Sequence, residues 1–340
     1  MLNLWNINSI SCMIGASQHF LGVIMNTQHI QPKVVHNAVP LAFFAPACDF
    51  QDESFINQAD KHADHLPTAV RDALREFHAH PHKSGGLLIK GLMVGDLPAT
   101  PATPTEPTTK DCTSELTLLT VAKCLGEPVG YEPELGGRLI QNLVPTKAAS
   151  DRQVSTSSKV PLMFHTEAAF HPHRPSYLLL LCLKGDPAAS TTLASIREVL
   201  PLLSDDVVRV LFQPRYRTAI DESYLHGRAN VLGELVPVLS GDSEYPTMVF
   251  DADLMVGEDA EAQAALDALS CAVESCHTGV CLEKGDLLVV DNAVAVHGRS
   301  QYSPRFDGTD RWLQRTFVVD NLTDSADERQ GRVISTTFGI

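Results

Sequence analysis

The chain has 340 residues, 44% of them hydrophobic and 20% charged, a composition typical of a folded globular protein rather than a disordered one. Its 26 Lys and Arg against 41 Asp and Glu give a formal net charge of −15, which argues against a nucleic-acid partner, because phosphate binding needs clustered basic residues. No uninterrupted apolar run of about 18 residues follows the first 25, so we expect no membrane span.

The N-terminal residues and the cysteines indicate in which cellular compartment the protein is expected. Residues 1–25 are apolar but lack a basic start, which argues against a secretory signal, and we expect a poorly defined extension with Met1 or Met25 as the first residue. The eight cysteines form no C-x-x-C pair, which favours reduced thiols in a cytoplasmic protein. Residues 26–340 are expected to form a single domain.

Helical and strand patterns alternate through the first half of the chain. Residues 68–79 have helical spacing after Pro67, and residues 86–91 read as a short buried strand. The Pro- and Thr-rich residues 97–109 predict a mobile surface loop. We then expect a helix over residues 113–125 and a strand over 138–144.

The second half is richer in strands. The apolar run over residues 177–183 favours a core strand, and a helix-loop-helix is expected over 195–212. Residues 213–245 predict a lid-like insertion, and residues 259–276 a helix. Further strands are expected over residues 280–291, 293–297 and 312–320. The sequence therefore predicts a mainly β protein with flanking helices and a double-stranded β-helix (jelly-roll) core.

Three residues suggest a metal centre. His165 and Glu167 lie at i and i+2, which on one strand places both side chains on one face. His297 ends a later β-like run and could complete the set. Two histidines and one carboxylate leave three positions open on iron(II), enough for a bidentate 2-oxo acid and O2. An isolated His-x-Glu is a weak signal, because such pairs are common without a metal.

Charged residues near this set suggest ligand contacts. A guanidinium at Arg311 could clamp the distal carboxylate of a 2-oxo diacid, although an Arg on a solvated strand is the alternative. Asp251 and Asp253, also at i and i+2, could bind an ammonium or guanidinium, or could be turn residues at a strand end. His171 and His173 favour loop or supporting roles over a second metal site.

Residues 157–183, 190–195 and 290–315 carry a family resemblance. They are similar to the clavaminate synthase-like branch of the 2-oxoglutarate-dependent oxygenases, which resembles the taurine dioxygenase group and includes hydroxylases of free arginine, asparagine and lysine. The resemblance covers roughly residues 135–320. It implies Fe(II), 2-oxoglutarate and O2 as cofactors and cosubstrates, and hydroxylation of Cβ or Cγ of a free L-amino acid with release of succinate and CO2.

The resemblance also implies roles for individual residues. The iron ligands would be His165, Glu167 and His297, and the 2-oxoglutarate contacts Arg311 and Thr191, with Thr192 as the alternative to Thr191. The amino-acid contacts would be Gln141, Ser157, Glu167, Asp251, Asp253 and Arg315, with Arg315 on the substrate carboxylate. The two aspartates favour lysine or arginine without separating them.

Two other interpretations remain open at this point. The same scaffold could carry a cupin-like metal protein that isomerises, hydrolyses or simply binds a ligand. An oxygenase of this kind could also desaturate or cyclise its substrate instead of hydroxylating it. A halogenase is disfavoured, because it would lack the carboxylate ligand. The small-molecule partner expected is the amino acid itself, and the oligomeric state is not predicted.

Overall fold

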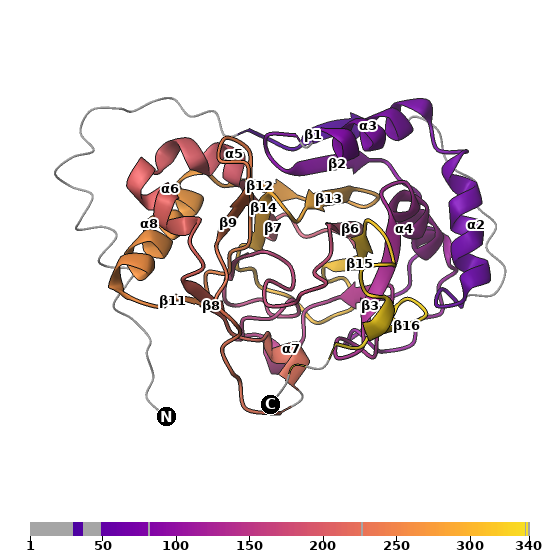
Figure 1. Cartoon of the computed structure of the whole chain (residues 1–340). Coiled ribbons are helices and arrows are strands. Elements are labelled where there is room, and N and C mark those ends of the chain that lie inside the picture. Colours follow the sequence, from indigo (N-terminus) through magenta and orange to yellow (C-terminus); the bar gives the residue numbers. More distant parts are fainter. Residues whose placement is uncertain (1–29, 37–48, 81, 226, 337, 339–340) are drawn as a thin grey trace.

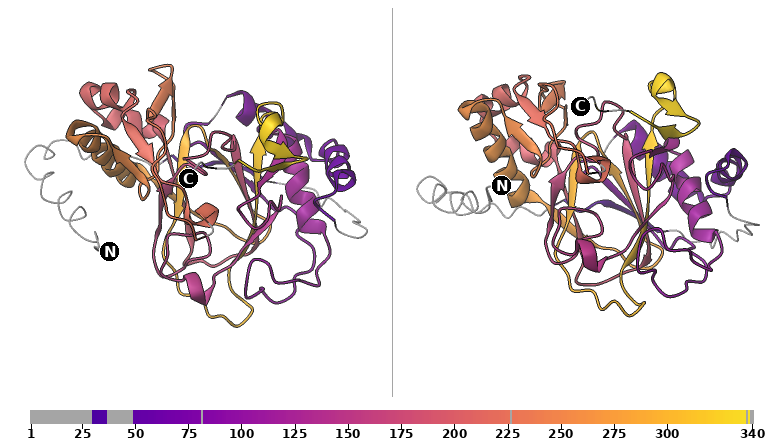
Figure 2. Two further views of the ribbon diagram at one scale, coloured as in Figure 1. Left: turned by 60° about the horizontal axis from the view of Figure 1, so that its bottom comes forward. Right: turned by 90° about the horizontal axis from the view of Figure 1, so that it is seen from below.

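Two facing β-sheets form the centre of the fold, and helices cover the outer side of each (Figures 1 and 2). The structure is a computed structural model that describes residues 30–36, 49–80, 82–225, 227–336 and 338. The extension predicted over residues 1–25 lies outside the described residues. The arrangement is the predicted jelly roll with flanking helices.

The larger sheet is mixed, with both parallel and antiparallel strand pairs. Its order is β1 (Lys33–His36), β2 (Gly86–Lys90), β13 (Leu287–Asp291), β6 (Tyr177–Lys184), β15 (Trp312–Val319), β3 (Glu127–Tyr131), β17 (Val333–Ile334) and β16 (Arg329–Gln330), and β4 (Gln141–Leu143) also pairs with β15. Most pairs are antiparallel, whereas β1–β2 and β3–β17 are parallel.

The smaller sheet carries the predicted histidines. Its order is β12 (Thr278–Cys281), β7 (Ser190–Ser195), β14 (Ala295–Arg299) and β5 (Leu162–His165), all antiparallel. Two ribbons lie beside it, β8 (Tyr216–Thr218) with β11 (Met255–Gly257) and β9 (Leu239–Gly241) with β10 (Pro246–Met248).

The helices divide between the two outer faces. Those on the larger sheet are α2 (Glu53–Ala63), α3 (Thr68–Ala79) and α4 (Thr113–Lys123), and those on the smaller sheet are α5 (Ile196–Val199), α6 (Asp205–Leu211) and α8 (Ala260–Cys276) (Figure 1). The short α7 (Glu222–Leu225) lies apart from both groups. Short 3-10 turns occur at Lys147–Ala149, Leu200–Leu202 and Ala326–Glu328.

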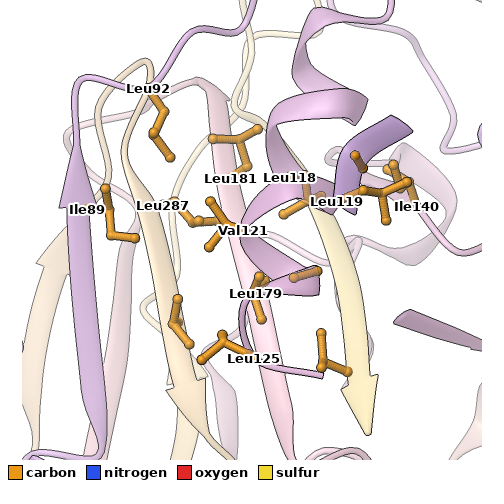
Figure 3. Close-up of a cluster of buried hydrophobic side chains, with 14 of the residues drawn as sticks. Ile89, Leu92, Leu118, Leu119, Val121, Leu125, Ile140, Leu179, Leu181 and Leu287 are labelled. Atoms are coloured by element: carbon orange, nitrogen blue, oxygen red, sulfur yellow. The ribbon is translucent and has the colours of Figure 1, made fainter. Parts of the chain in front are cut away.

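The unbroken apolar run of β6 has a simple cause. Both faces of this strand are buried, so both sets of alternating side chains must be apolar. Leu179 and Leu181 pack outward against α4, as Figure 3 shows, while Leu178 and Leu180 point inward between the sheets. The strand thus connects the core under α4 to the wall of the inner cavity.

Several sequence predictions need correction. The strand expected over residues 138–144 is limited to Gln141–Leu143. The loop over residues 97–109 is anchored rather than loose, because Thr100 donates through its N–H to the Gly308 carbonyl at 2.8 Å and through its hydroxyl to the Asp310 carbonyl at 2.7 Å. Residues 213–245 contain β8, α7 and β9, and their role as a lid stays a prediction.

The cysteines only partly match the expectation of thiols throughout. Cys124, Cys182, Cys276 and Cys281 are free. Cys112 and Cys271 each take part in a disulfide bond. Within the part of the chain that the structure describes, no helix has the length and apolar character needed to cross a membrane.

Candidate active site

The neighbouring strands β5 and β14 carry the two histidines predicted to bind metal. His165 ends β5 directly opposite His297 of β14, and their ring centroids lie 4.3 Å apart. Glu167 follows in the turn after β5. One ligand atom from each of the three residues lies within 4.8 Å of the other two. The structure therefore brings the three predicted ligands together.

Glu167 reaches this cluster from a turn, not from the strand that its spacing to His165 predicted. β5 ends because the next amides bond elsewhere: Thr166 N–H donates to the Phe250 carbonyl at 2.7 Å, and Glu167 N–H donates to Asn292 Oδ1 at 2.8 Å. Asn292 donates in return through Nδ2 to the Glu167 carbonyl at 3.1 Å. The buried Asn292 thus fixes the backbone of Glu167, a role that the sequence analysis missed.

The protonation states of the cluster suit a cation. Burial alone would raise the pKa of Glu167, but Arg315 and His297 outweigh it and lower this pKa to about 2. Burial, together with His165, lowers the pKa of His297 to about 4. At neutral pH the carboxylate is therefore charged and the His297 imidazole is neutral, the forms that coordinate a metal ion.

Unpaired atoms in the cluster support a metal site. Glu167 Oε2 is buried without a hydrogen-bond partner among the described residues, and His297 Nε2 lies 3.5 Å from it. His165 Nδ1 lies 2.8 Å from the Met163 carbonyl, an arrangement that fixes the ring and leaves Nε2 for a metal. Two imidazole nitrogens and one carboxylate oxygen are the donor set of non-haem iron(II) oxygenases. These residues fit an iron(II) ion.

The two residues predicted to bind 2-oxoglutarate lie together in the same cavity. Arg311, just before β15, donates through Nη2 to Thr191 Oγ1 on β7 at 3.3 Å, and both residues line the cavity with the metal cluster. Thr192, the alternative, follows Thr191 on β7, so its side chain points to the opposite face of the strand. Arg311 is 6% exposed, so its guanidinium is held away from water.

Arg315 lies on β15, lines the same cavity as Arg311 and belongs to a buried polar network. Its Nε donates to Gln141 Oε1 at 3.0 Å across the β4–β15 pair, and its Nη1 lies 3.5 Å from Glu167 Oε2. Its Nη2 also pairs with Glu134, a residue absent from the sequence-based site. Burial raises the pKa of Glu134 to about 7 despite the opposing charge of Arg315.

Acidic side chains form another part of the cavity wall. Asp251 and Asp253 both line it, joined by Asp221, which precedes α7 and was also not foreseen. Asp251 Oδ1 accepts from the N–H groups of Asp253 at 2.9 Å and Leu254 at 2.8 Å, so this carboxylate holds a turn. Asp251 is therefore a turn residue that also lines the cavity, and its binding of a cation stays a prediction.

Ser157 takes a different position from the other predicted substrate residues. It is fully buried in the loop before β5, and its hydroxyl accepts from Arg299 Nη2 at 3.0 Å. The neighbouring residues 153–155 form the adjacent cavity wall. His171 is buried against Tyr131, and His173 lies beside it; neither joins the metal cluster.

Comparison with known proteins agrees with this geometry. Residues 58–317 match the taurine catabolism dioxygenase TauD, TfdA family. The chain belongs to this family. An L-lysine 3-hydroxylase from Catenulispora acidiphila is 39% identical over 291 residues, which cover 84% of this chain and 81% of that protein. An L-asparagine oxygenase from Streptomyces coelicolor is 38% identical over 264 residues, covering 76% and 78% of the two chains.

Solved structures resemble this TauD/TfdA family member across most of its length. Asparagine oxygenase in complex with Fe(II), 2S,3S-3-hydroxyasparagine and succinate has a TM-score of 0.79 and 34% identity, covering 85% of this chain and 91% of that one. The non-haem iron oxygenase OrfP in complex with Fe and alpha-ketoglutaric acid has a TM-score of 0.76 and 34% identity, covering 84% and 92%. The protein is an iron- and 2-oxoglutarate-dependent oxygenase. This excludes the alternative of a cupin-like isomerase, hydrolase or ligand-binding protein.

Proposed function

We propose that the protein hydroxylates Cβ or Cγ of a free basic L-amino acid, lysine or arginine, with 2-oxoglutarate and O2 as cosubstrates and succinate and CO2 as co-products. The acidic wall of the cavity carries this proposal. Asp221, Asp251 and Asp253 face the same cavity as the metal cluster, with no Lys or Arg ion pair to any of them among the described residues. A cationic side chain would supply the missing positive charge.

The electrostatics of the wall support a cationic ligand. Burial raises the pKa of Asp251, and burial together with the nearby Asp221 raises the pKa of Asp253. Asp251 is buried, whereas Asp253 is exposed, and the like charges of Asp221 and Asp253 repel each other. Bound lysine or arginine would relieve the repulsion, whereas a neutral side chain would not.

The opposite end of the substrate would lie at β15. We assign the substrate carboxylate to Arg315, which lines the cavity and whose guanidinium lies against Glu167 and against Gln141, a buried residue outside the cavity lining. Gln141 and Glu167 would then receive the α-amino end. Ser157 would affect the substrate indirectly, by holding in place the loop before β5 whose residues 153–155 line the cavity. With both ends held, the carbon atoms between them would be placed beside the metal cluster.

Residues of this chain would then bind both the iron and the 2-oxoglutarate. His165, Glu167 and His297 would hold the iron, and Arg311 with Thr191 would hold the distal carboxylate of 2-oxoglutarate. When bound, iron and 2-oxoglutarate supply the oxidising power needed to functionalise an unactivated C–H bond. The chain contributes orientation and a cavity that excludes bulk water from that bond.

The similar proteins include one named for a basic amino acid and one named for a neutral amino acid. By name, one acts on lysine and another on asparagine. The family alone therefore does not choose between a basic and a neutral side chain, and the choice rests on the acidic wall. A cytoplasmic location and a small-molecule amino-acid partner, without nucleic acid, remain part of the same proposal.

A substrate panel tests the proposal directly. The full-length protein would be incubated with iron(II), 2-oxoglutarate, O2 and each free L-amino acid, and mass spectrometry would detect the product alongside succinate. We expect lysine or arginine to gain one oxygen atom. Best turnover of asparagine or another neutral amino acid would contradict the proposal. A product that has lost two hydrogens would instead identify desaturation or cyclisation.

A further inference from the structure

Arg299, the last residue of β14, lies two residues after His297 and faces the loop that precedes β5. Its side chain is buried, with 4% of the residue exposed, and it lines the cavity. Among the residues that the structure describes, no carboxylate lies within ion-pair distance of its guanidinium. A buried guanidinium without a carboxylate could serve either a ligand or the fold.

Counting donors decides between these two roles. A guanidinium has five N–H groups. All five have acceptors here: Nε donates to Ser300 O at 3.1 Å, Nη1 to Ser157 O at 2.7 Å and Ser155 O at 3.4 Å, and Nη2 to Ser157 Oγ at 3.0 Å and Val160 O at 3.0 Å. No N–H group remains for a ligand.

Arg311 shows the opposite pattern. It donates to Thr191, and Tyr302 lies beside it, which leaves N–H groups for a carboxylate. Tyr302 also packs against Arg299, whose guanidinium carbon lies 5.3 Å from the ring centroid. Two arginines in one cavity wall are therefore chemically distinct: Arg311 has donors to offer, and Arg299 has only its charge.

The loop held by Arg299 forms part of the substrate cavity. Gln153, Val154 and Ser155 line the cavity, yet residues 150–161 contain neither helix nor strand. The loop bonds to itself and to its base, for example from Lys159 N–H to the Ser150 carbonyl at 2.9 Å. Four of the five Arg299 hydrogen bonds tie residues 155–160 to the strand that carries His297.

We propose that Arg299 is a positioning residue that fixes residues 153–160 against β14 and thereby sets the distance between the cavity wall and the metal cluster. Its guanidinium geometry serves the loop and hence the amino-acid substrate. Its charge, which no carboxylate neutralises, favours the 2-oxoglutarate dianion from a distance. The amino-acid part of this inference rests on the proposed function, whereas the loop and 2-oxoglutarate parts do not.

Two substitutions separate geometry from charge. Arg299→Lys keeps the charge but presents three donors from a single atom, which cannot reach five acceptors. Arg299→Met removes both. We expect both variants to increase amide hydrogen exchange over residues 150–160 and to raise the KM for the amino acid by about 10-fold or more, with a smaller change in kcat. The Kd for 2-oxoglutarate should stay near wild type in the Lys variant and rise several-fold in the Met variant.

A matched control is Arg332→Lys. Arg332 also donates to several oxygens, including Glu127 Oε2 and Glu53 Oε1, but it lies outside the cavity lining. This control should leave loop exchange, KM and 2-oxoglutarate binding unchanged; the same changes as in Arg299→Lys would overturn the positioning role. Unaltered loop exchange in Arg299→Lys, or an equal loss of 2-oxoglutarate binding in Lys and Met, would also overturn it.

The readouts keep this test separate from the substrate proposal. Hydrogen exchange and anaerobic 2-oxoglutarate titration need no amino acid, and KM can be measured with whichever amino acid is turned over. If the Met variant fails to fold, Arg299→Lys and Ser157→Ala carry the test through loop exchange. Ser157→Ala removes one acceptor of the five and should raise exchange less than Arg299→Lys does; no rise in either variant would reject the inference.

Discussion

Replacing Arg311 with Met is the sharpest test of the cosubstrate site. The guanidinium is buried at 6% exposure and has N–H groups beyond the one that contacts Thr191. Met has a similar length and leaves no charge. A bound dicarboxylate would then keep a buried negative charge without its partner, which costs about 2–5 kcal/mol. The Kd for 2-oxoglutarate should therefore rise by about 30-fold to several thousand-fold.

The assay can be made specific for this step. 2-Oxoglutarate would be titrated anaerobically into the iron(II)-loaded protein while its metal-to-ligand charge-transfer absorption is followed. Thr191→Val is the matched comparison, because it removes one neutral hydrogen-bonding group worth about 0.5–1.5 kcal/mol. That loss should raise the Kd only about 2- to 12-fold. Binding of the amino acid to the same two variants should change much less.

The pattern of losses decides whether the reasoning holds. Similar losses for 2-oxoglutarate and the amino acid in Arg311→Met would mean that Arg311 supports the whole cavity. An unchanged Kd for 2-oxoglutarate would show that its distal carboxylate is bound elsewhere. A larger effect from Thr191→Val than from Arg311→Met would reverse the assigned ranking of the two contacts.

Three further predictions follow from the same structure. Asp253→Asn should raise the KM for lysine or arginine by about 10- to 100-fold, because a charged hydrogen bond is lost, and should leave 2-oxoglutarate binding intact; an unchanged KM would remove Asp253 from the substrate site. Since burial and Asp221 raise the pKa of Asp253, that KM should rise as pH falls toward this raised pKa in wild type and should rise less steeply in Asp253→Asn, where Asp251 still titrates, as pH-dependent kinetics would show. Glu167→Ala should abolish stoichiometric iron binding, measured by metal analysis, whereas Glu283→Ala, outside the cavity lining, should retain it.

The fold was predictable where the sequence pattern follows local rules. The helix at residues 68–79 has matching ends in sequence and structure, because its apolar spacing and preceding Pro67 are local signals. β6 was predictable because a strand buried on both faces must be apolar throughout. The strand at 138–144 was overestimated: Leu139 and Ile140 are buried, but they pack beneath α4 instead of pairing in the sheet.

The site was predictable only as far as its spacing signals reach. The i and i+2 spacing identified His165 and Glu167, although the chain turns between them. The i and i+4 spacing correctly placed Arg311 and Arg315 on the same side of the chain, because both line the cavity. No such signal marks Asn292, whose role depends on a hydrogen bond to a residue 125 positions away.

Residues that joined the site from distant loops were missed for the same reason. Glu134 reaches Arg315 across 181 positions of sequence. Asp221 enters the cavity from the segment before α7, where an aspartate near a Ser and a Glu predicts only a turn. Their proximity follows from the closure of two sheets and could not be read from local spacing.

The cavity also gives the overall charge a meaning that composition could not. A net charge of −15 spread over the chain says little about a substrate, but the structure shows which charged side chains line the cavity. Arg311 and Arg315 line the cavity together with Asp221, Asp251 and Asp253. With Arg311 assigned to 2-oxoglutarate, an amino acid with a cationic side chain would place its carboxylate toward Arg315 and its cation toward the aspartates. In that orientation the two ends are both bound by opposite charges, and only the carbons between them face the metal cluster. A neutral side chain would satisfy the arginine end alone and would leave the aspartates without a cation, which is why the proposed preference is for lysine or arginine.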